Sequence, residues 1–357
     1  MHLDKSSIEI SRVVLGCMWS ERLSESEVVR LIHAACDAGV TSFDTAPLYG
    51  FHSSERILGR ALRDRRAKVQ ILTKAGLRWD GTHGGVLFEF TDEGGIRRAV
   101  RKDSRPAQLV ADVEASLTRL GTDVIDLLQI HHPDDQTPLE ESLNALTALV
   151  KAGKVRALGV SNFSPAQLAE ACGFLATRAP LASLQCEYNL LERWPERALL
   201  PLCEQHELAL LAYSPLAKGA LADPGSAAGR RARDDSFYGH PLARPLIAAA
   251  VRDVLVPLAI RHRVSAGAIA LACVLASSTR SAVVVGASSE QQVQDNARAQ
   301  QVTLSPTELS EVRRRFAALD TPLRALRRTL SLPVVSRVDS LARRALGKLS
   351  RASKHAR

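Results

Sequence analysis

Two alternating patterns of apolar residues run along most of the chain. Short β-branched runs, typical of buried strands, alternate with longer stretches in which apolar residues recur at helical spacing. The strand-like runs cover residues 13–15, 40–44, 69–74, 124–131, 155–160, 184–188, 208–213 and 282–286. Eight such runs with helices between them predict an α/β fold, namely a (β/α)8 TIM barrel.

Capping residues locate the beginnings of several helices. Ser24, followed three positions later by Glu27, has the pattern of a capping box. The other expected starts are Ser53, Ser104 with Pro106, and Ser164 with Pro165. The connection after the seventh strand holds two predicted helices, at about residues 245–261 and 265–276.

Two connections are longer than ordinary βα turns. Residues 76–103 follow the third strand, and residues 217–244 follow the seventh. Both leave the carboxyl ends of the strands, where barrels keep their chemistry, so we expect lids or specificity loops. We predict one barrel domain over residues 1–320 and a basic C-terminal tail over residues 321–357.

The formal net charge of +9 comes from the tail. Residues 321–357 hold ten Lys or Arg and one acid, which leaves 37 cations and 37 anions in residues 1–320. A neutral body gives no reason to expect a nucleic-acid partner. Over residues 334–349, apolar residues recur at helical spacing opposite basic ones. The tail is interpreted as a partly disordered, solvated extension or as a basic amphipathic helix that contacts an anionic surface or partner.

Cysteine usage and hydropathy indicate the compartment. Six cysteines are scattered without a CxxC pair, which favours buried thiols in a reducing environment over disulfides. The N-terminus lacks the apolar core of a signal peptide, and the longest nearly apolar run, residues 266–276, is too short to span a bilayer. We therefore expect a cytoplasmic protein without a transmembrane segment.

Four side chains with complementary chemistry follow strand ends. Asp44 ends the second predicted strand, and Tyr49 comes five residues later. Lys74 ends the third strand and His131 the fourth. A phenol beside an ammonium that a carboxylate holds can give up a proton near neutral pH. His131 and His132 are not expected to form a metal site, because adjacent strand residues face opposite ways and no further ligand pattern is present. We therefore expect no metal in this protein.

A series of motifs in chain order resembles the aldo-keto reductase family over about residues 8–315. The motifs are residues 43–50 (FDTAPLYG), 73–74 (TK), 116–121 (SLTRLG) with Asp126, 130–134 (IHHPD), 153–163 (GKVRALGVSNF), 185–189 (QCEYN), 212–216 (AYSPL), and 285–286 (VG) followed by Gln292 and Asn296. So many collinear motifs make the resemblance specific.

The resemblance implies an oxidoreductase that reduces an aldehyde or ketone with a nicotinamide cofactor. Tyr49 would protonate the carbonyl oxygen as hydride arrives from nicotinamide C4, and His131 would orient the carbonyl. Lys74, paired with Asp44, would make the phenol more acidic. The alternatives are an NAD-preferring dehydrogenase of a sugar or other alcohol, and a nucleotide-sensing partner protein without turnover.

The same resemblance places cofactor contacts at the ends of the later strands. Ser161, Asn162 and Gln185 would bind the nicotinamide carboxamide, and Tyr213 would stack on the ring. The residues expected along the rest of the cofactor are Ser214, Leu216, Gly219, Gly286, Ser288, Gln292 and Asn296. NADP is the first choice from the family.

NAD is the alternative cofactor, because residues 286–292 contain Glu290 and no cation to meet a 2′-phosphate. The substitute phosphate contacts would be Arg230, Arg231 or Arg233 in the second long connection. Tyr238 of that connection is expected to be an exposed loop aromatic, whereas Tyr188 should pack in the barrel. The family offers a third interpretation of the tail, as a cover over the substrate pocket.

Overall fold

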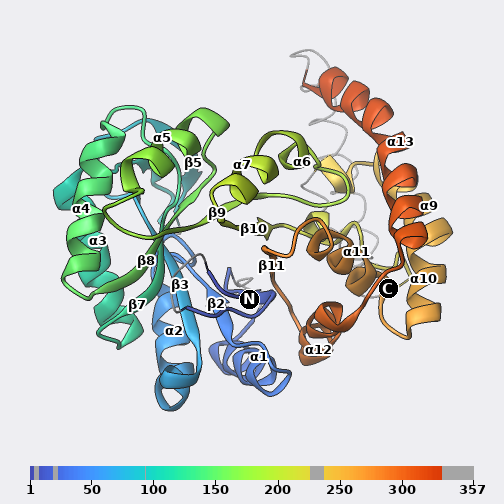
Figure 1. The fold of residues 1–357 in the computed structure, drawn as a ribbon, viewed down its shortest axis with the longest axis horizontal. Coiled ribbons are helices and arrows are strands. Elements are labelled where there is room, and N and C mark those ends of the chain that lie inside the picture. The colour runs from blue at the N-terminus through green and yellow to red at the C-terminus, as the bar shows by residue number, and fades with distance from the viewer. Residues whose placement is uncertain (4–7, 19–22, 93, 226–236, 332–357) are drawn as a thin grey trace.

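The strands predicted from the apolar runs form a closed barrel in the computed structural model of the chain, which describes residues 1–3, 8–18, 23–92, 94–225 and 237–331 (Figure 1). Neighbouring strands are parallel, in the order β1-β11-β10-β9-β8-β7-β3-β2. Their bounds are β1 Val13–Gly16, β2 Ser42–Asp44, β3 Gln70–Ala75, β7 Ile125–Ile130, β8 Val155–Ser161, β9 Leu181–Glu187, β10 Ala209–Tyr213 and β11 Ser281–Val285. The predicted (β/α)8 barrel is confirmed.

Helices surround the strands and bury an apolar face against them. They are α1 Glu25–Asp37, α2 Ser53–Leu62, α3 Pro106–Leu120, α4 Leu139–Lys151, α5 Pro165–Leu175, α6 Pro195–Ala198, α7 Leu200–Gln205, α9 Arg244–Ala250, α10 Val256–His262, α11 Ala266–Leu275, α12 Glu290–Arg298 and α13 Pro306–Leu330. A π-helical turn, Val251–Leu255, joins α9 to α10. The two helices expected after the seventh strand are therefore confirmed as α9 to α10 and α11.

Two of the expected helix starts use side-chain caps. Ser24 and Ser164 form the capping boxes of α1 and α5, each accepting a hydrogen bond from the backbone three residues later. Helices α2 and α3 begin differently, with His52 and Arg105 at the N-cap and no capping hydrogen bond from either side chain. Pro106, at the first turn of α3, supplies a preset φ angle instead.

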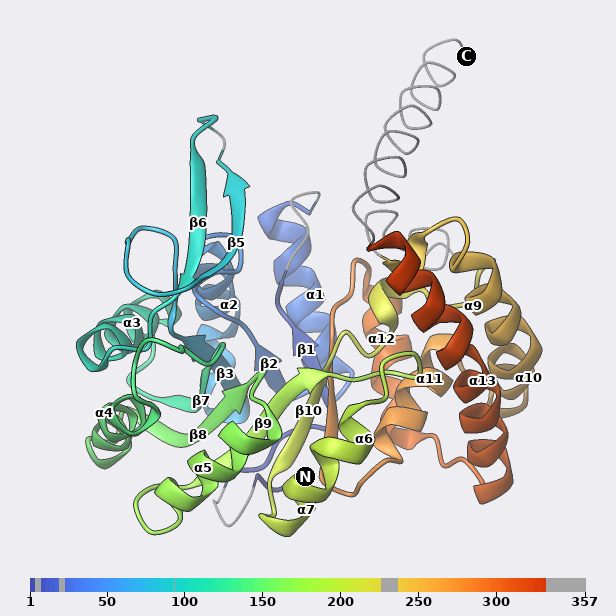
Figure 2. The same ribbon diagram turned by 90° about the horizontal axis from the view of Figure 1, so that it is seen from above.

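The first long connection contains a small sheet of its own. Its strands β4 (Leu77–Arg78), β5 (Val86–Thr91) and β6 (Arg97–Lys102) pair antiparallel in the order β4-β6-β5. The hairpin of β5 and β6 projects from the barrel, as Figure 2 shows. We expected only a glycine-rich loop here, so the hairpin is an addition to the prediction.

The N-terminal residues cover one end of the barrel. Leu3, Ile8 and Ile10 are buried and join the cluster of apolar side chains inside the barrel, which includes Leu72 and Leu127. These residues lead into β1, so they lie at the amino ends of the strands. The carboxyl ends are left for the polar residues of the site.

Helix α13 crosses residue 320, where we set the boundary between barrel and tail. Phe316 and Leu323, on either side of that boundary, are buried in one apolar cluster with residues of α9 and α11. The first turns of the predicted tail thus belong to a helix that packs on the barrel. The basic stretch over residues 334–349 lies outside the described residues.

All six cysteines are free thiols, and five of them are buried, in agreement with the expected absence of a disulfide framework. Among the described residues, no single helix has the length and apolar character to cross a membrane. One bent pair, Arg244–His262 with Ala266–Leu275, meets these criteria only when its two helices are counted together.

Candidate active site

The barrel brings the four candidate catalytic residues together. Asp44 ends β2, Lys74 lies in β3, His131 directly follows β7, and Tyr49 lies in the turn after β2. Nζ of Lys74 donates to Oδ1 of Asp44 at 2.5 Å and to the carbonyl oxygen of Thr45 at 3.0 Å. The same Nζ lies 5.0 Å from the centre of the Tyr49 ring. The rings of Tyr49 and His131 meet edge to face with centroids 5.9 Å apart.

Two glutamines complete the surroundings of Asp44. Nε2 of Gln185 donates to Oδ2 of Asp44 at 2.8 Å, and Nε2 of Gln129 lies 3.3 Å from the same oxygen. Gln185 also donates to Gln129, at 3.3 Å. We predicted Gln185 as a cofactor contact. In the structure its amide nitrogen binds the carboxylate of Asp44. Gln129 was missed, although a glutamine in the apolar strand Ile125–Ile130 was a visible signal.

A second buried network fixes β3 from its outer side. Oγ1 of Thr73 donates to Oε1 of Glu55 at 2.7 Å, and Nε of Arg119 donates to Oε2 of Glu55 at 2.6 Å. Thr73 precedes Lys74, so it faces the helices while Lys74 faces the interior. The strand of the lysine is therefore bound to both α2 and α3.

Burial decides the protonation state of the phenol. Removal from water raises the pKa of Tyr49, and the positive charge of Lys74 lowers it by less. For Lys74, burial lowers the pKa, but the Asp44 carboxylate and Tyr49 together leave it above its usual value. The charge of Lys74 makes the phenol more acidic, as we expected, but burial has the larger effect, which the sequence did not show. At neutral pH the site holds a protonated phenol above a charged ammonium.

His131 is neutral in this environment. Burial, followed by the charges of Lys74 and His132, holds its pKa well below the ordinary value. Burial and Lys102 lower the pKa of His132 to about 4. The two rings stack with centroids 5.6 Å apart and an interplanar angle of 23°. Our argument that they face opposite ways was wrong, because both residues follow the last residue of β7, where strand alternation ends.

Asn162 connects the histidines to the expected cofactor residues. Its Nδ2 donates to the carbonyl oxygen of His131 at 3.0 Å and lies 3.1 Å from Nε2 of His132. Its Oδ1 accepts a hydrogen bond from Oη of Tyr213 at 2.9 Å, and its backbone N–H donates to the carbonyl of Gln185. The backbone of Asn162 has a φ of 62°, a left-handed conformation that asparagine adopts more readily than most residues. Ser161, which contacts the same amide at 3.1 Å, completes this group.

The remaining predicted cofactor residues lie after β10 and β11. Ser214 has a φ of 49°, and a left-handed turn over residues 217–219 follows Leu216 and includes Gly219 with a φ of 95°. Beyond β11, the backbone N–H and the hydroxyl of Ser288 both donate to Oε1 of Gln292, at 2.8 and 3.1 Å. Asn296 lies on α12 with its Nδ2 3.4 Å from the carbonyl of Gly286. These segments lie at the carboxyl ends of neighbouring strands, and the second leads into the N-terminus of α12, where anions bind well.

A cation from another helix lies near this turn. Nε of Arg30, on α1, lies 3.7 Å from Oε1 of Glu290, the first residue of α12. Both side chains are more than half exposed. The alternative cations that we considered, residues 230, 231 and 233, lie outside the described residues.

Aromatic side chains gather beside the turn that carries Tyr49. The ring centroid of Phe51 lies 5.2 Å from that of Trp79 and 5.0 Å from that of Phe90. His52 contacts Trp79, with centroids 4.8 Å apart. Trp79 directly follows β4 and Phe90 lies in β5, so the first long connection adds an apolar surface beside the turn that carries Tyr49.

Tyr188 and Tyr238 have structural roles. Tyr188 is buried, as expected, and its hydroxyl donates to Glu196 at 2.9 Å. Tyr238 is also buried, with 4% of its surface exposed, so the expectation of an exposed loop aromatic was wrong. The guanidinium of Arg327, from α13, lies 5.9 Å from the Tyr238 ring and 4.6 Å from that of Phe237. Arg327 of the C-terminal helix is therefore one of the side chains that contact this tyrosine.

The sequence and the fold both match known proteins. The sequence profile of the Aldo/keto reductase family matches residues 12–315. Aldo-keto reductase YhdN of Bacillus subtilis (strain 168) is 38% identical over 245 residues, which are 66% of each protein. The NADH-specific methylglyoxal reductase of Escherichia coli (strain K12) is 31% identical over 339 residues, which are 89% of this chain and 98% of the relative.

A solved structure agrees with these relationships. The glycerol dehydrogenase AKR11B4 from Gluconobacter oxydans matches with a TM-score of 0.76 and 35% identity, over 89% of this chain and 94% of that protein. With the barrel and the four clustered residues described above, these matches show that the chain belongs to the aldo-keto reductase family and is an oxidoreductase acting on carbonyl and alcohol groups.

Proposed function

We propose that this enzyme reduces an aldehyde or ketone with a dihydronicotinamide cofactor and that Tyr49 donates the proton. The observation that carries the proposal is the protonated phenol of Tyr49 placed over the buried pair of Lys74 and Asp44 and beside the neutral ring of His131. A proton donor has to be protonated at the working pH, and burial keeps this phenol so.

In the proposed reaction each side chain has a separate role. A neutral His131 donates a hydrogen bond to the carbonyl oxygen and holds it near Tyr49. As the carbonyl carbon accepts hydride, the phenolic proton moves to the oxygen and the alcohol forms. The resulting phenolate is stabilised by the fixed charge of Lys74, and a proton from solvent restores the phenol. Asp44 does not touch the substrate and acts by holding Lys74 in place and charged.

The chemistry of the residues after β8 to β11 fits a nicotinamide dinucleotide. Ser161, Asn162 and Gln185 offer amide and hydroxyl groups suited to a carboxamide, and Tyr213 offers an aromatic face. Ser214, Leu216 and Gly219 would follow the pyrophosphate, and the start of α12 would hold the adenosine end through Gly286, Ser288, Gln292 and Asn296. When bound, the cofactor supplies the hydride.

For the cofactor we propose a preference for NADH over NADPH. Glu290 begins the helix at the adenosine end, and its carboxylate would repel a 2′-phosphate. The nearby cation, Arg30, is already paired with Glu290. The name of the Escherichia coli relative, NADH-specific methylglyoxal reductase, agrees with this choice. Our first choice from the sequence was NADP, and the pairing of Arg30 with Glu290 is the observation that favours NAD instead.

For the substrate we propose a small carbonyl compound with an apolar or aromatic substituent. Phe51, Trp79 and Phe90 lie beside the turn of Tyr49 and would contact such a substituent. The cytoplasmic location and a role for the basic tail at a surface or partner stay predictions. No described contact favours a non-catalytic role.

A carbonyl panel tests the proposal. Initial rates are measured on small aliphatic and aryl aldehydes with NADH and NADPH, for the wild type and for Tyr49→Phe. We expect turnover with NADH that falls by roughly 10²- to 10⁴-fold in the variant, the usual contribution of a general acid, while the affinity for NADH is unchanged. Full turnover by Tyr49→Phe would show that another group delivers the proton.

A further inference from the structure

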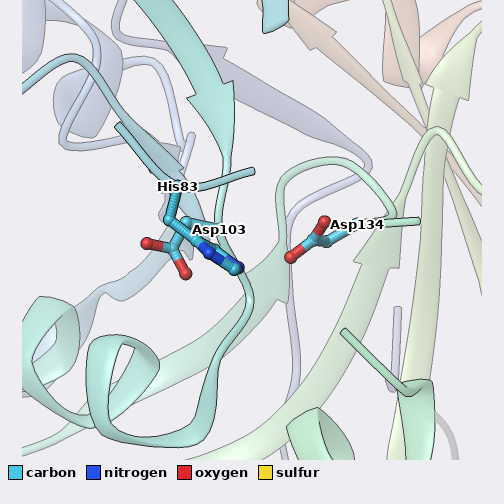
Figure 3. A group of neighbouring side chains, drawn as sticks. All are labelled: His83, Asp103 and Asp134. Atoms are coloured by element: carbon cyan, nitrogen blue, oxygen red, sulfur yellow. The ribbon is translucent and has the colours of Figure 1, made fainter. Parts of the chain in front are cut away.

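A histidine and two aspartates from separate segments meet outside the reaction site. His83 lies between β4 and β5, Asp103 directly follows β6, and Asp134 lies in the loop after β7. One nitrogen or oxygen atom of each residue lies within 4.8 Å of those of the other two. Figure 3 shows the imidazole of His83 between the two carboxylates in this view.

The backbone holds these residues close to one another. The N–H of Lys102 donates to the carbonyl of Gly85 at 2.9 Å, which joins the loop of His83 to the end of β6. Gly84 has a φ of 87°, and a Cβ at this position would lie 1.8 Å from the carbonyl oxygen of Lys102, so only glycine fits. The N–H of Ser104 donates to Oδ2 of Asp134 at 3.0 Å and brings the third residue to the same place.

The cluster contains buried polar atoms without a partner. Nε2 of His83 is buried and makes no hydrogen bond in the structure, and the same holds for Oγ of Ser104, next to Asp103. Four such side-chain atoms occur among the described residues; one belongs to this cluster and another to the residue that follows Asp103. A buried ring nitrogen is costly to leave unpaired, and in the tautomer with its proton on Nδ1 the lone pair of Nε2 is free to bind a ligand.

We propose that His83, Asp103 and Asp134 bind a divalent transition-metal ion, with Zn²⁺ as the best fit. One imidazole nitrogen and two carboxylate oxygens form a ligand set that zinc accepts, with water as a fourth ligand. Each carboxylate keeps an oxygen with only one hydrogen bond from the described residues. Oδ2 of Asp103 accepts from Arg105, and Oδ1 of Asp134 accepts from the N–H of Gln136.

Distances and charge set the expected strength of binding. In a tetrahedral site with bonds of about 2.1 Å, the ligand atoms lie roughly 3.4 Å apart, so gaps of at most 4.8 Å close by small side-chain rotations. Arg105 donates to both oxygens of Asp103, at 2.8 and 2.7 Å, and its positive charge opposes a cation. We therefore expect binding weaker than that of a four-ligand structural zinc site.

A bound ion would connect two segments that flank the reaction site. His83 and Asp103 bracket the β5 to β6 hairpin, and Asp134 follows the strand whose end carries His131. An ion held by all three would fix the hairpin to the barrel. Its binding does not depend on the proposed reaction, and it can be measured without substrate or cofactor.

Isothermal titration calorimetry of the full metal-free chain with ZnCl₂, in the presence of a phosphine reductant, tests the proposal. We expect one ion per chain. His83→Ala and Asp134→Asn should each weaken zinc binding by about tenfold or more. Losing a residue that only hydrogen-bonds a metal ligand already costs about tenfold in affinity, and these two variants remove a ligand itself. The matched control is His206→Ala, at the end of α7 and outside the cluster, which should bind as the wild type does.

Limited trypsin digestion gives a second measurement. Arg97 and Arg98 are exposed on β6, and zinc should slow cleavage there in the wild type and in His206→Ala but not in His83→Ala. Circular dichroism establishes that each variant is folded, and Asp134→Asn replaces His83→Ala if the latter is not. A folded wild type that binds no zinc would overturn the proposal. Unchanged zinc binding in both cluster variants would do the same, because the ion would then be held elsewhere.

Discussion

Nζ of Lys74 lies 2.5 Å from Oδ1 of Asp44, and the two side chains are only 1% and 2% exposed. Removing two charges from water is costly, and their mutual attraction offsets that cost only while both are present. The pair therefore fixes a positive charge under Tyr49 at neutral pH. Loss of either partner leaves an uncompensated charge in the barrel.

Asp44→Asn should destabilise the protein and slow the reaction. An unpaired buried Lys74 costs about 3–5 kcal/mol, and its charge is no longer held for the phenolate. Urea unfolding and kcat measure the two effects. Asp37→Asn, which removes an exposed ion pair with Arg65, should cost less than about 1 kcal/mol. Equal stability of both variants would contradict the role given to the buried pair.

The rate of carbonyl reduction should be level between about pH 6 and pH 9. The pKa of His131 lies well below 6.5 and that of Tyr49 above 10, so neither group changes charge in this window. Reduction should slow only as pH rises through the pKa of the phenol. A pH series of kcat measures this. An inflection between pH 7 and 8 would mean that the charge of Lys74 outweighs burial in setting the pKa of Tyr49.

Acid should destabilise the fold through His132. Its pKa is about 4 in the folded protein and about 6.5 when unfolded, so the unfolded chain binds more protons as pH falls. The stability is complete above pH 6.5 and is lost between about pH 6.5 and pH 4, by at most about 3 kcal/mol for this partly buried ring. Urea unfolding at pH 7 and 4.5 measures the loss. His132→Gln should reduce it, whereas His206→Gln should leave it unchanged.

Glu290→Gln should raise the relative use of NADPH. The substitution removes the carboxylate at the start of α12 and frees Arg30 for a phosphate. We expect the ratio of kcat/KM for NADPH to that for NADH to rise by about tenfold. Arg30→Ala combined with Glu290→Gln should cancel most of the gain. If this kcat/KM ratio is unchanged in both variants, the 2′ position of the cofactor's adenosine ribose does not lie near Glu290.

A chain ending at residue 320 should be less stable than one ending at residue 331. The longer chain keeps Leu323 in the apolar cluster and Arg327 over Phe237 and against Glu192. Burial of one leucine alone is worth about 1.5–3 kcal/mol. Thermal unfolding of both truncated chains gives the comparison. If they unfold at the same temperature, the last turns of α13 do not support the barrel.

The sequence predicted the barrel because its strands are buried on both faces and stand out as apolar runs. The hairpin of β5 and β6 escaped because its exposed strands mix charged and apolar residues among glycines. The clustering of Asp44, Tyr49, Lys74 and His131 could be predicted from their places at or shortly after strand ends. The protonation state of the phenol could not, because the balance between desolvation and the Lys74 charge depends on packing that no motif displays. The pairing of Arg30 with Glu290 joins helices at opposite ends of the chain and has no local signal.

The contact of Arg119 with Glu55, and of Glu55 with Thr73, has a practical consequence for enzyme engineering. Arg119 lies in the outer ring of helices, yet it holds the strand that carries Lys74. A random-mutagenesis screen that reads only product formation will score Arg119 as sensitive and group it with the residues that touch substrate. Measuring the fraction of each variant that is still folded after heating will separate this supporting residue from the residues that take part in the reaction.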